Sequence, residues 1–244
     1  MASPTPSPHF DHVRYWVFDL DNTLYSADLG LFDLIDVKMG RYISELLGVD
    51  AGDARIIQKR YFRDHGTTLA GLMHHHGIDP HDFLEFVHDI DMAALDPRPD
   101  LARQIADLPG EKYIFTNADA TYAAKVLERL GLSALFSGIH DIHATRYQPK
   151  PEDHAYDSLI ETLDIDPRQS LFFEDMARNL LPAKKRGMAT VWIDNGSELG
   201  DHGHDPEHID LHIKDLSQAL ATITASLNQD KRASEPQNKR TAIL

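Results

Sequence analysis

Five short runs of apolar and β-branched residues recur along the chain, and from the second run onward helix-length segments separate them. The runs are YWVFDL, KYIFTN, GIHDI, SLFFED and ATVWID, at residues 15–20, 112–117, 138–142, 170–175 and 189–194. Intervening segments such as ADATYAAKVLERLG have the apolar spacing of amphipathic helices. Strands that alternate with helices predict a parallel sheet covered by helices on both faces. The predicted fold class is therefore α/β, with a doubly wound, Rossmann-like parallel sheet.

A long insertion separates the first predicted strand from the second. Residues 21–111 lie between them, whereas a βαβ unit needs only roughly 30 residues. Segment 31–48 carries an apolar stripe with helical spacing and ends at Gly48, as helices often do. Further helices are predicted at residues 53–65, 67–76 and 79–90. We expect residues 26–94 to form a small helical cap inserted after the first strand.

The two ends of the chain have a different composition from the rest. Residues 1–12 are rich in Pro and Ser, and residues 228–244 are polar almost to the end. Such segments bury too little apolar surface to fold, and we predict that both are flexible tails. The α/β core is then expected to comprise residues 13–25 and 95–227.

Composition limits the classes of protein that the chain can represent. Of its 244 residues, 42% are hydrophobic, which suffices for a sizeable core, but no apolar run approaches the roughly 20 residues of a membrane-spanning helix. The start lacks the features of a secretory signal, and the chain contains no cysteine. A formal net charge of -15 argues against nucleic-acid binding. These features predict a cytoplasmic protein that binds neither membranes nor nucleic acids.

Acidic and polar side chains follow the predicted strands where each strand ends. They are Asp19 and Asp21 after the first strand, Thr116 and Asn117 after the second, Lys150 in the loop beyond the third, and Glu174 and Asp175 after the fourth. Ligands of open α/β sheets bind at this edge. Carboxylates gathered around one lysine and one hydroxyl indicate a hard cation such as Mg²⁺ together with an anionic substrate.

Each of these residues also has an ordinary structural explanation. Two aspartates after a strand often form a turn or cap a helix, and Lys150 between two prolines is compatible with a solvated loop. Thr116 and Asn117 could cap the helix that follows them, although helix N-termini also favour anions. The combination of all four positions favours the chemical interpretation.

The sequences DLDNT, FTN, the lysine of QPKPE and FFED occur in the order of the four motifs of the haloacid dehalogenase-like superfamily, which the chain resembles over nearly the whole predicted core. The resemblance implies that Asp19 is a nucleophile that forms an aspartyl-phosphate. It further implies that Asp21 protonates the leaving oxygen and then deprotonates the attacking water. The remaining roles that it implies are phosphate binding by Asn22, Thr116 and Asn117, and charge neutralisation by Lys150.

The same resemblance implies an Mg²⁺ cofactor. Its ligands would be the side chain of Asp19, the main-chain carbonyl of Asp21 and the side chain of Asp175. In this superfamily the fourth motif can be two adjacent acids or two acids four or five residues apart, and here the later position holds Asn179. Glu174 and Asn179 are therefore expected in the outer shell. An acid two residues after the nucleophile resembles the phosphatases of the superfamily rather than its dehalogenases.

Two further stretches resemble the pyrimidine 5'-nucleotidase branch of the superfamily. They are FDLDNTLY, which ends at Tyr25, and GTTLAGL at residues 66–72, preceded by His65 where the pattern has Tyr. The resemblance implies hydrolysis of nucleoside monophosphates such as UMP or CMP, with Tyr25 and Thr68 contacting the substrate. Thr67 or Thr68 could instead cap a helix. The alternatives are a broader phosphatase of sugar or other small organic phosphates, and a non-catalytic regulatory protein.

Two histidine-rich stretches lie outside these motifs. The run HHH at 74–76 is expected to end a cap helix. The segment DHGHDPEH at 201–208 could place three histidines around a transition metal, but its Gly, Pro and Asp residues are typical of a solvated loop. Neither stretch is predicted to be a metal site.

Overall fold

The fold was analysed in a computed structural model, which describes residues 10–197 and 199–234. Within these residues, six parallel strands form one sheet in the order β3-β2-β1-β4-β5-β6. The strands are β1 (Tyr15–Phe18), β2 (Glu111–Phe115), β3 (Gly138–His140), β4 (Ser170–Glu174), β5 (Ala189–Ile193) and β6 (Leu211–Ile213). The predicted α/β class with a parallel sheet is confirmed.

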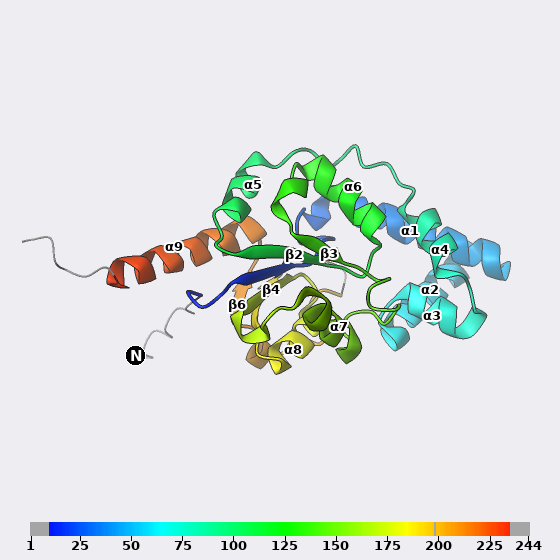
Figure 1. The fold of residues 1–244 in the computed structure, drawn as a ribbon. Coiled ribbons are helices and arrows are strands. Elements are labelled where there is room, and N and C mark those ends of the chain that lie inside the picture. The colour runs from blue at the N-terminus through cyan, green and yellow to red at the C-terminus, as the bar shows by residue number, and fades with distance from the viewer. Residues whose placement is uncertain (1–9, 198, 235–244) are drawn as a thin grey trace, which may run out of the picture.

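Helices cover both faces of the sheet (Figure 1). On one face lie α5 (Pro99–Ala106), α6 (Ala120–Leu130) and α9 (Leu216–Ser234), and on the other α7 (Asp153–Leu163) and α8 (Ala177–Lys185). Trp16 and Phe18 of β1 pack into the first layer, whereas Val17 between them packs into the second. Because both faces of β1 are buried, its sequence is continuously apolar instead of alternating.

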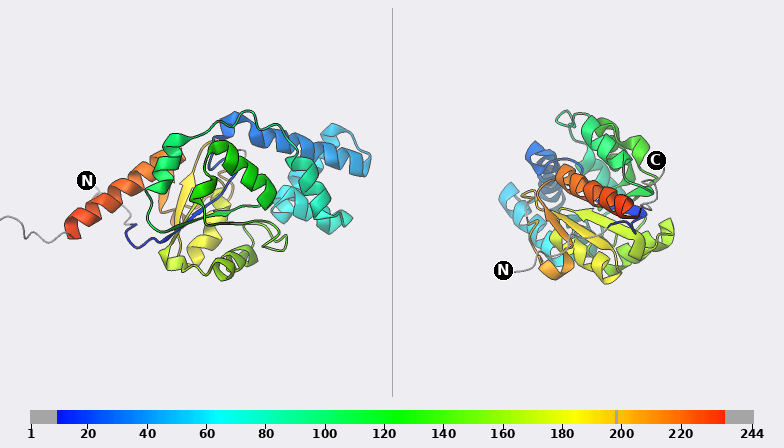
Figure 2. Two further views of the ribbon diagram at one scale, coloured as in Figure 1. Left: turned by 45° about the horizontal axis from the view of Figure 1, so that its top comes forward. Right: turned by 90° about the vertical axis from the view of Figure 1, so that its left-hand side faces the viewer.

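The first four α-helices after β1 in the sequence form the cap, and α5 follows them before β2. The cap helices are α1 (Leu31–Leu47), α2 (Ala51–His65), α3 (Thr68–His76) and α4 (Pro80–His88). The two views of Figure 2, together with Figure 1, place them beyond the carboxyl ends of the strands, away from α9. Their ends follow ordinary capping rules, since α1 stops at Gly48 with φ 66° and Asp79 caps α4 ahead of Pro80.

The structure differs from the sequence predictions at three places. Phe10 falls inside the predicted N-terminal tail, yet it is only 1% exposed and belongs to the core. Helix α9 continues to Ser234, beyond the predicted boundary at 227. Strand β6 was not predicted, because a three-residue strand with partly exposed side chains at the sheet edge leaves no apolar run. Residues 1–9 and 235–244 of the predicted tails lie outside the described residues.

Among the helices that the structure describes, none has the length and apolar character required to cross a bilayer.

Candidate active site

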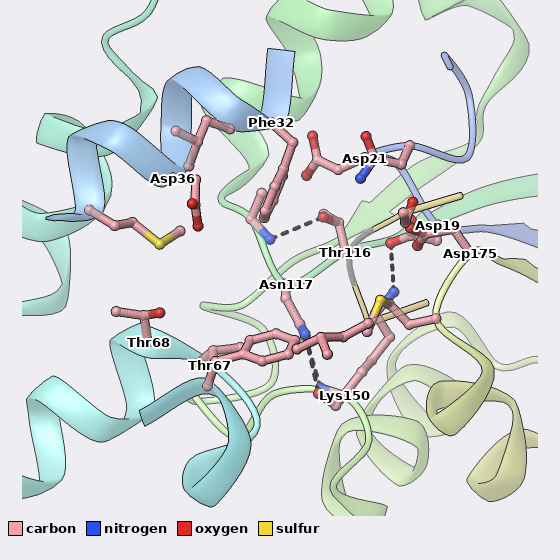
Figure 3. A pocket seen from close by; sticks show the side chains of 18 of the residues that line it. Asp19, Asp21, Phe32, Asp36, Thr67, Thr68, Thr116, Asn117, Lys150 and Asp175 are labelled. Atoms are coloured by element: carbon pink, nitrogen blue, oxygen red, sulfur yellow. Dashed lines mark hydrogen bonds and ion pairs between the residues drawn. The ribbon is translucent and has the colours of Figure 1, made fainter. Parts of the chain in front are cut away.

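Asp19 and Lys150 form a buried ion pair at the carboxyl end of β1. Asp19 directly follows the strand and is 6% exposed, and Lys150 reaches it from the loop beyond β3 with its side chain 1% exposed. The Lys150 ammonium donates to Asp19 Oδ1 at 2.7 Å, to Glu174 Oε2 at 2.7 Å and to the carbonyl of Phe115 at 2.8 Å. All three donor positions of the ammonium are therefore used, and two carboxylates share one cation. Figure 3 shows the side chains of Asp19 and Lys150 at this end of the pocket.

Burial and mutual repulsion perturb the charges of this group. Burial, together with the neighbouring Glu174, raises the pKa of Asp19 to about 7, although Lys150 partly opposes the shift. Burial lowers the pKa of Lys150, but the charges of Asp19 and Glu174 outweigh it and raise that pKa. Lys150 therefore keeps its positive charge, and a second cation beside the carboxyl groups would favour their ionised forms.

Asp175 completes a cluster of three carboxylates with Asp19 and Glu174. One oxygen of each lies within 4.8 Å of the others. Burial, Glu174 and Asp19 raise the pKa of Asp175 well above its usual value. Glu174 already accepts hydrogen bonds from Lys150 and from the Met176 N–H at 3.1 Å. These oxygens are the donors that a hard metal ion prefers.

Asn179 also reaches this region. It lines the pocket, and its side-chain Oδ1 is buried with no hydrogen-bond partner among the described residues. Buried polar atoms normally have a partner. The orphaned oxygen fits an outer-shell group beside a hydrated ion, and so the residues present are suited to a metal.

Asp21 occupies a different environment from Asp19. Its Oδ1 accepts hydrogen bonds from the hydroxyl of Tyr25 at 2.6 Å and from that of Tyr122 at 2.8 Å. Burial raises the pKa of Asp21, although both hydroxyl groups oppose the shift. Among the described residues no hydrogen bond reaches Oδ2, so the two oxygens of Asp21 differ in their surroundings.

The structure places Tyr25 differently from the sequence expectation. Tyr25 is 2% exposed, and it holds Asp21 instead of forming part of the pocket wall. Its phenol ring packs in the core, and this position does not favour direct contact with a substrate. Tyr122, which sequence reasoning missed, lies 101 residues from Asp21. No local pattern marks it, because it is one of several buried positions on α6.

The three residues expected to bind phosphate all lie at the pocket wall. Thr116 is buried, and its Oγ1 accepts the Ala118 N–H at 3.0 Å, which leaves its hydroxyl hydrogen available to a ligand. The Asn117 amide binds the main chain of Lys150 twice, at 3.2 Å to the carbonyl and at 2.8 Å from the N–H. Asn117 therefore fixes the loop that carries Lys150. Asn22 has φ 60°, and its Oδ1 is buried without a partner among the described residues.

A pocket of about 430 Å³ extends from this cluster to the cap. Figure 3 shows Asp19, Asp21 and Asp175 at one end and Asp36 and Thr68 at the other. Apolar side chains from the cap complete the wall, including those of Phe32, Met39, Phe62, Phe83 and Val87. The volume lies in the range typical of sites for small organic ligands.

Polar groups at the cap end are also paired. Asp36 accepts from Gln58 Nε2 at 2.6 Å and from Lys59 Nζ at 3.1 Å, and it also pairs with Arg55. Thr67 caps α3, since its hydroxyl accepts the Ala70 N–H at 3.1 Å, while Thr68 begins the helix. Both threonines line the pocket. The capping explanation therefore applies to Thr67, and Thr68 keeps its predicted place at the pocket.

The two histidine-rich stretches lie apart from the acidic cluster. His204 packs on Trp192 with ring centroids 4.7 Å apart, and α3 ends at His76. In the part of the chain that the structure describes, three possible metal-binding groups converge at Asp19, Glu174 and Asp175 and at no histidine.

The sequence is similar to those of known proteins. A family model described as haloacid dehalogenase-like hydrolase matches residues 13–187. Phosphate metabolism protein 8 of Saccharomyces cerevisiae is 25% identical over 209 residues, which cover 78% of this chain and 64% of that protein. The chain thus spans less than two thirds of the length of that relative. Bifunctional epoxide hydrolase 2 of Mus musculus is 39% identical over 46 residues, 19% of this chain and 8% of that protein.

Solved structures share the fold at low sequence identity. A HAD phosphatase from Thermococcus onnurineus superposes with a TM-score of 0.57 at 17% identity, covering 85% of this chain and 96% of that one. The L-2-haloacid dehalogenase of Xanthobacter autotrophicus gives a TM-score of 0.53 at 17% identity, covering 87% and 98%. At this identity the similarity shows the fold alone. Because the family model spans most of the sequence, the chain belongs to the haloacid dehalogenase-like hydrolase family.

Proposed function

We propose that the chain is an Mg²⁺-dependent phosphomonoester hydrolase that acts through an aspartyl-phosphate on Asp19. The observation that carries the proposal is the pair of unlike aspartates at the end of β1. Asp19 is paired with Lys150 beside the acidic cluster, whereas Asp21 is held by two tyrosine hydroxyls with its second oxygen free among the described residues. One aspartate is thus arranged to attack phosphorus and the other to move a proton.

In the first step an oxygen of Asp19 forms a bond to phosphorus while the bond from phosphorus to the leaving oxygen breaks. The proton of the Asp21 carboxyl group moves to that leaving oxygen. In the second step the oxygen of a water molecule forms a bond to phosphorus while the bond from phosphorus to the Asp19 oxygen breaks, and Asp21 takes the proton of that water. Phosphate is released, and Asp19 returns as a carboxylate and Asp21 as a carboxylic acid. Lys150, held on two carboxylates and a carbonyl, balances negative charge on Asp19 and the phosphoryl group.

The residues fit the predicted cofactor. Mg²⁺, held by the side chains of Asp19 and Asp175 and by the main-chain carbonyl of Asp21, would supply positive charge to the phosphoryl oxygens. The raised pKa values of Asp19 and Asp175 and the orphaned Asn179 oxygen support this assignment. In the structure of YfnB from Bacillus subtilis, a HAD-hydrolase with a TM-score of 0.55 at 17% identity, the protein is bound to magnesium.

For the substrate we propose a pyrimidine nucleoside monophosphate such as UMP or CMP. The pocket continues from the acidic cluster into the cap, the segment 26–94, where Phe32, Phe62 and Phe83 line its wall. Aromatic side chains of this kind favour a planar, partly apolar group such as a nucleobase. Lys59 and Thr68 supply polar groups at the same end. The GTTLAGL segment, which carries the resemblance to nucleotidases, contributes Thr67, Thr68 and Leu69 to the pocket wall.

Substrate choice is tested by measuring phosphate release with Mg²⁺ from UMP, CMP, AMP, GMP and several sugar phosphates. The proposal expects the highest kcat/KM for UMP or CMP. Equal efficiency on purine and pyrimidine nucleotides, or a preference for sugar phosphates, would support the broader phosphatase instead. Release from none of these substrates would support a non-catalytic protein.

The nucleophile is tested by Asp19→Asn, which keeps the shape of the side chain. Turnover should fall by roughly 10³-fold or more, as loss of a nucleophile does in other enzymes. The control is Asp107→Asn, since Asp107 is an exposed carboxyl group at the end of α5. Mass spectrometry of the wild-type protein quenched during turnover should show one phosphoryl group on Asp19. Near-normal turnover by Asp19→Asn would contradict the mechanism.

A further inference from the structure

A chain of contacts leads from the last cap helix to Asp21. His88 is the final residue of α4, and its side chain is 10% exposed. Its Nδ1 lies 2.5 Å from Oδ2 of Asp119, and its ring stacks on that of Tyr122 with centroids 4.2 Å apart and 17° between the planes. The ring of His88 therefore rests on two core residues at the start of α6.

Asp119 contacts both His88 and the backbone of Tyr122. It caps α6 through Oδ1, which accepts the Tyr122 N–H at 2.9 Å, while Oδ2 accepts from His88. Burial raises the pKa of Asp119, but the His88 hydrogen bond and the capping N–H outweigh it and lower that pKa to about 2. Asp119 is thus an ionised acceptor, and His88 must be the donor.

Tyr122 links these contacts to the active site. Its hydroxyl donates to Asp21 Oδ1 at 2.8 Å, beside the hydroxyl of Tyr25 at 2.6 Å. The two phenol oxygens lie 3.5 Å apart, so they flank one carboxylate oxygen. A shift of the Tyr122 ring would turn the Asp21 carboxyl group and with it the oxygen that transfers the proton.

We propose that His88 is a positioning residue that couples docking of the cap to the alignment of Asp21, acting through the ring of Tyr122. The inference rests on the proposed function, because it assigns Asp21 as the general acid. His88 touches neither Asp21 nor the nucleophile in the structure, and its contacts with Asp119 and Tyr122 exist while α4 lies against the start of α6. The acid is therefore aligned when the cap is in place over the substrate.

The consequence concerns the leaving group. When the bond from phosphorus to oxygen breaks, a basic alkoxide needs the proton of Asp21, whereas nitrophenolate leaves without it. Damage to the alignment of Asp21 should therefore lower kcat/KM for UMP strongly, for phenyl phosphate less, and for p-nitrophenyl phosphate least. A loss of folding should lower all three values alike. His88 also lines the pocket, and a loss of binding should affect phenyl phosphate and p-nitrophenyl phosphate alike, because the two differ only by a nitro group. The comparison of these two substrates therefore reports the alignment of Asp21.

Two variants separate the contact of His88 with Tyr122 from the contact of Tyr122 with Asp21. Tyr122→Phe keeps the ring under His88 and removes the hydroxyl on Asp21, while His88→Asn keeps a donor for Asp119 and removes the stacked ring. We expect each to lower kcat/KM for UMP by about 10-fold or more, part of the general-acid contribution, with less than about a 3-fold change for p-nitrophenyl phosphate. The double variant should be no worse than Tyr122→Phe, because both act through one hydroxyl.

The matched control is His81→Asn on the same helix. His81 also joins the cap to the core, stacking on His143 at 4.7 Å and lying 3.1 Å from the Tyr147 hydroxyl, but it does not contact Tyr122. It should leave the dependence on the leaving group unchanged. Equal losses on all three substrates, or additive losses in the double variant, would overturn the role of His88. A wild-type protein that hydrolyses none of them would overturn the proposed function as well.

Discussion

Lys150 is the residue that makes two buried carboxylates compatible with a folded site. Its ammonium contacts Asp19 and Glu174 at 2.7 Å each, with 1% of the side chain exposed. A charge taken out of water is tolerated when it is paired and hydrogen-bonded, and here the Phe115 carbonyl satisfies the remaining donor. The residue thus has a structural role and a proposed catalytic role at once.

Lys150→Met tests both roles, since methionine keeps much of the length of the side chain without its charge. Two buried carboxylates would lose their partner, and we expect the free energy of unfolding to fall by about 3 kcal/mol without metal. Turnover should fall by about 100-fold or more. Urea unfolding in EDTA and phosphate release measure the two effects. Lys185→Met, at an exposed position on α8, is the control. Unchanged stability would show that the ion pair is not formed.

At the scale of elements, the GTTLAGL segment has a packing explanation beside its proposed role in binding. Gly66 adopts φ 82° between α2 and α3, and its carbonyl accepts from Arg178 at 2.9 Å. Gly71 lies where α3 crosses α2, and a Cβ there would stand 2.4 Å from Cβ of Tyr61. Both glycines are thus required by the backbone of the cap, whatever the substrate is.

Gly71→Ala should therefore destabilise the protein although alanine favours helices. The new methyl group would force α3 away from α2, and overpacking of this kind costs about 1–3 kcal/mol. Gly40→Ala on α1 is the contrasting variant, because its nearest atom is Gln58 Oε1 at 3.5 Å, an ordinary contact. That change should stabilise the protein by up to about 1 kcal/mol. Urea unfolding of both variants measures the difference, and equal effects would contradict the close helix contact.

At the scale of the whole molecule, two buried groups respond to acid in opposite directions. Burial lowers the pKa of His140 to about 4, against 6.5 for an unperturbed histidine. The unfolded chain therefore binds a proton there first, and stability is lost as the pH falls from 6.5 towards 4. Burial raises the pKa of Asp19 from 3.8 to about 7. The folded chain therefore holds this proton more tightly than the unfolded chain, and stability is lost as the pH rises from 3.8 towards 7.

His140→Leu should remove the first of these contributions. The wild-type protein should lose more unfolding free energy between pH 7 and pH 4.5 than the variant does, because leucine cannot bind a proton. His202→Leu, at an exposed position, should keep the wild-type pH profile. Urea unfolding at several pH values, all in EDTA, gives the comparison. Parallel profiles for the wild-type protein and His140→Leu would show that His140 does not contribute.

Most of the candidate site could be predicted because its residues directly follow strands. An apolar run marks the end of β1 and of β4, and the side chains after it, Asp19 and Asp175, must meet at one edge of a parallel sheet. The sequence predicted less well where a residue's role depends on its partner. Tyr25 was expected to contact substrate, and the structure instead places its hydroxyl on Asp21.

The parallel α/β sheet, the helices inserted after β1 and the acids at the strand ends could be predicted from the sequence, because each depends on the apolar pattern of a local segment. Tertiary structure alone decided that Tyr122, 101 residues from Asp21, holds that acid, and that His88 of the cap rests on Tyr122. The short edge strand β6 and the burial of Phe10 are likewise features that only the folded structure shows. Each depends on which surfaces pack together, and that is a property of the folded chain and not of any segment read alone.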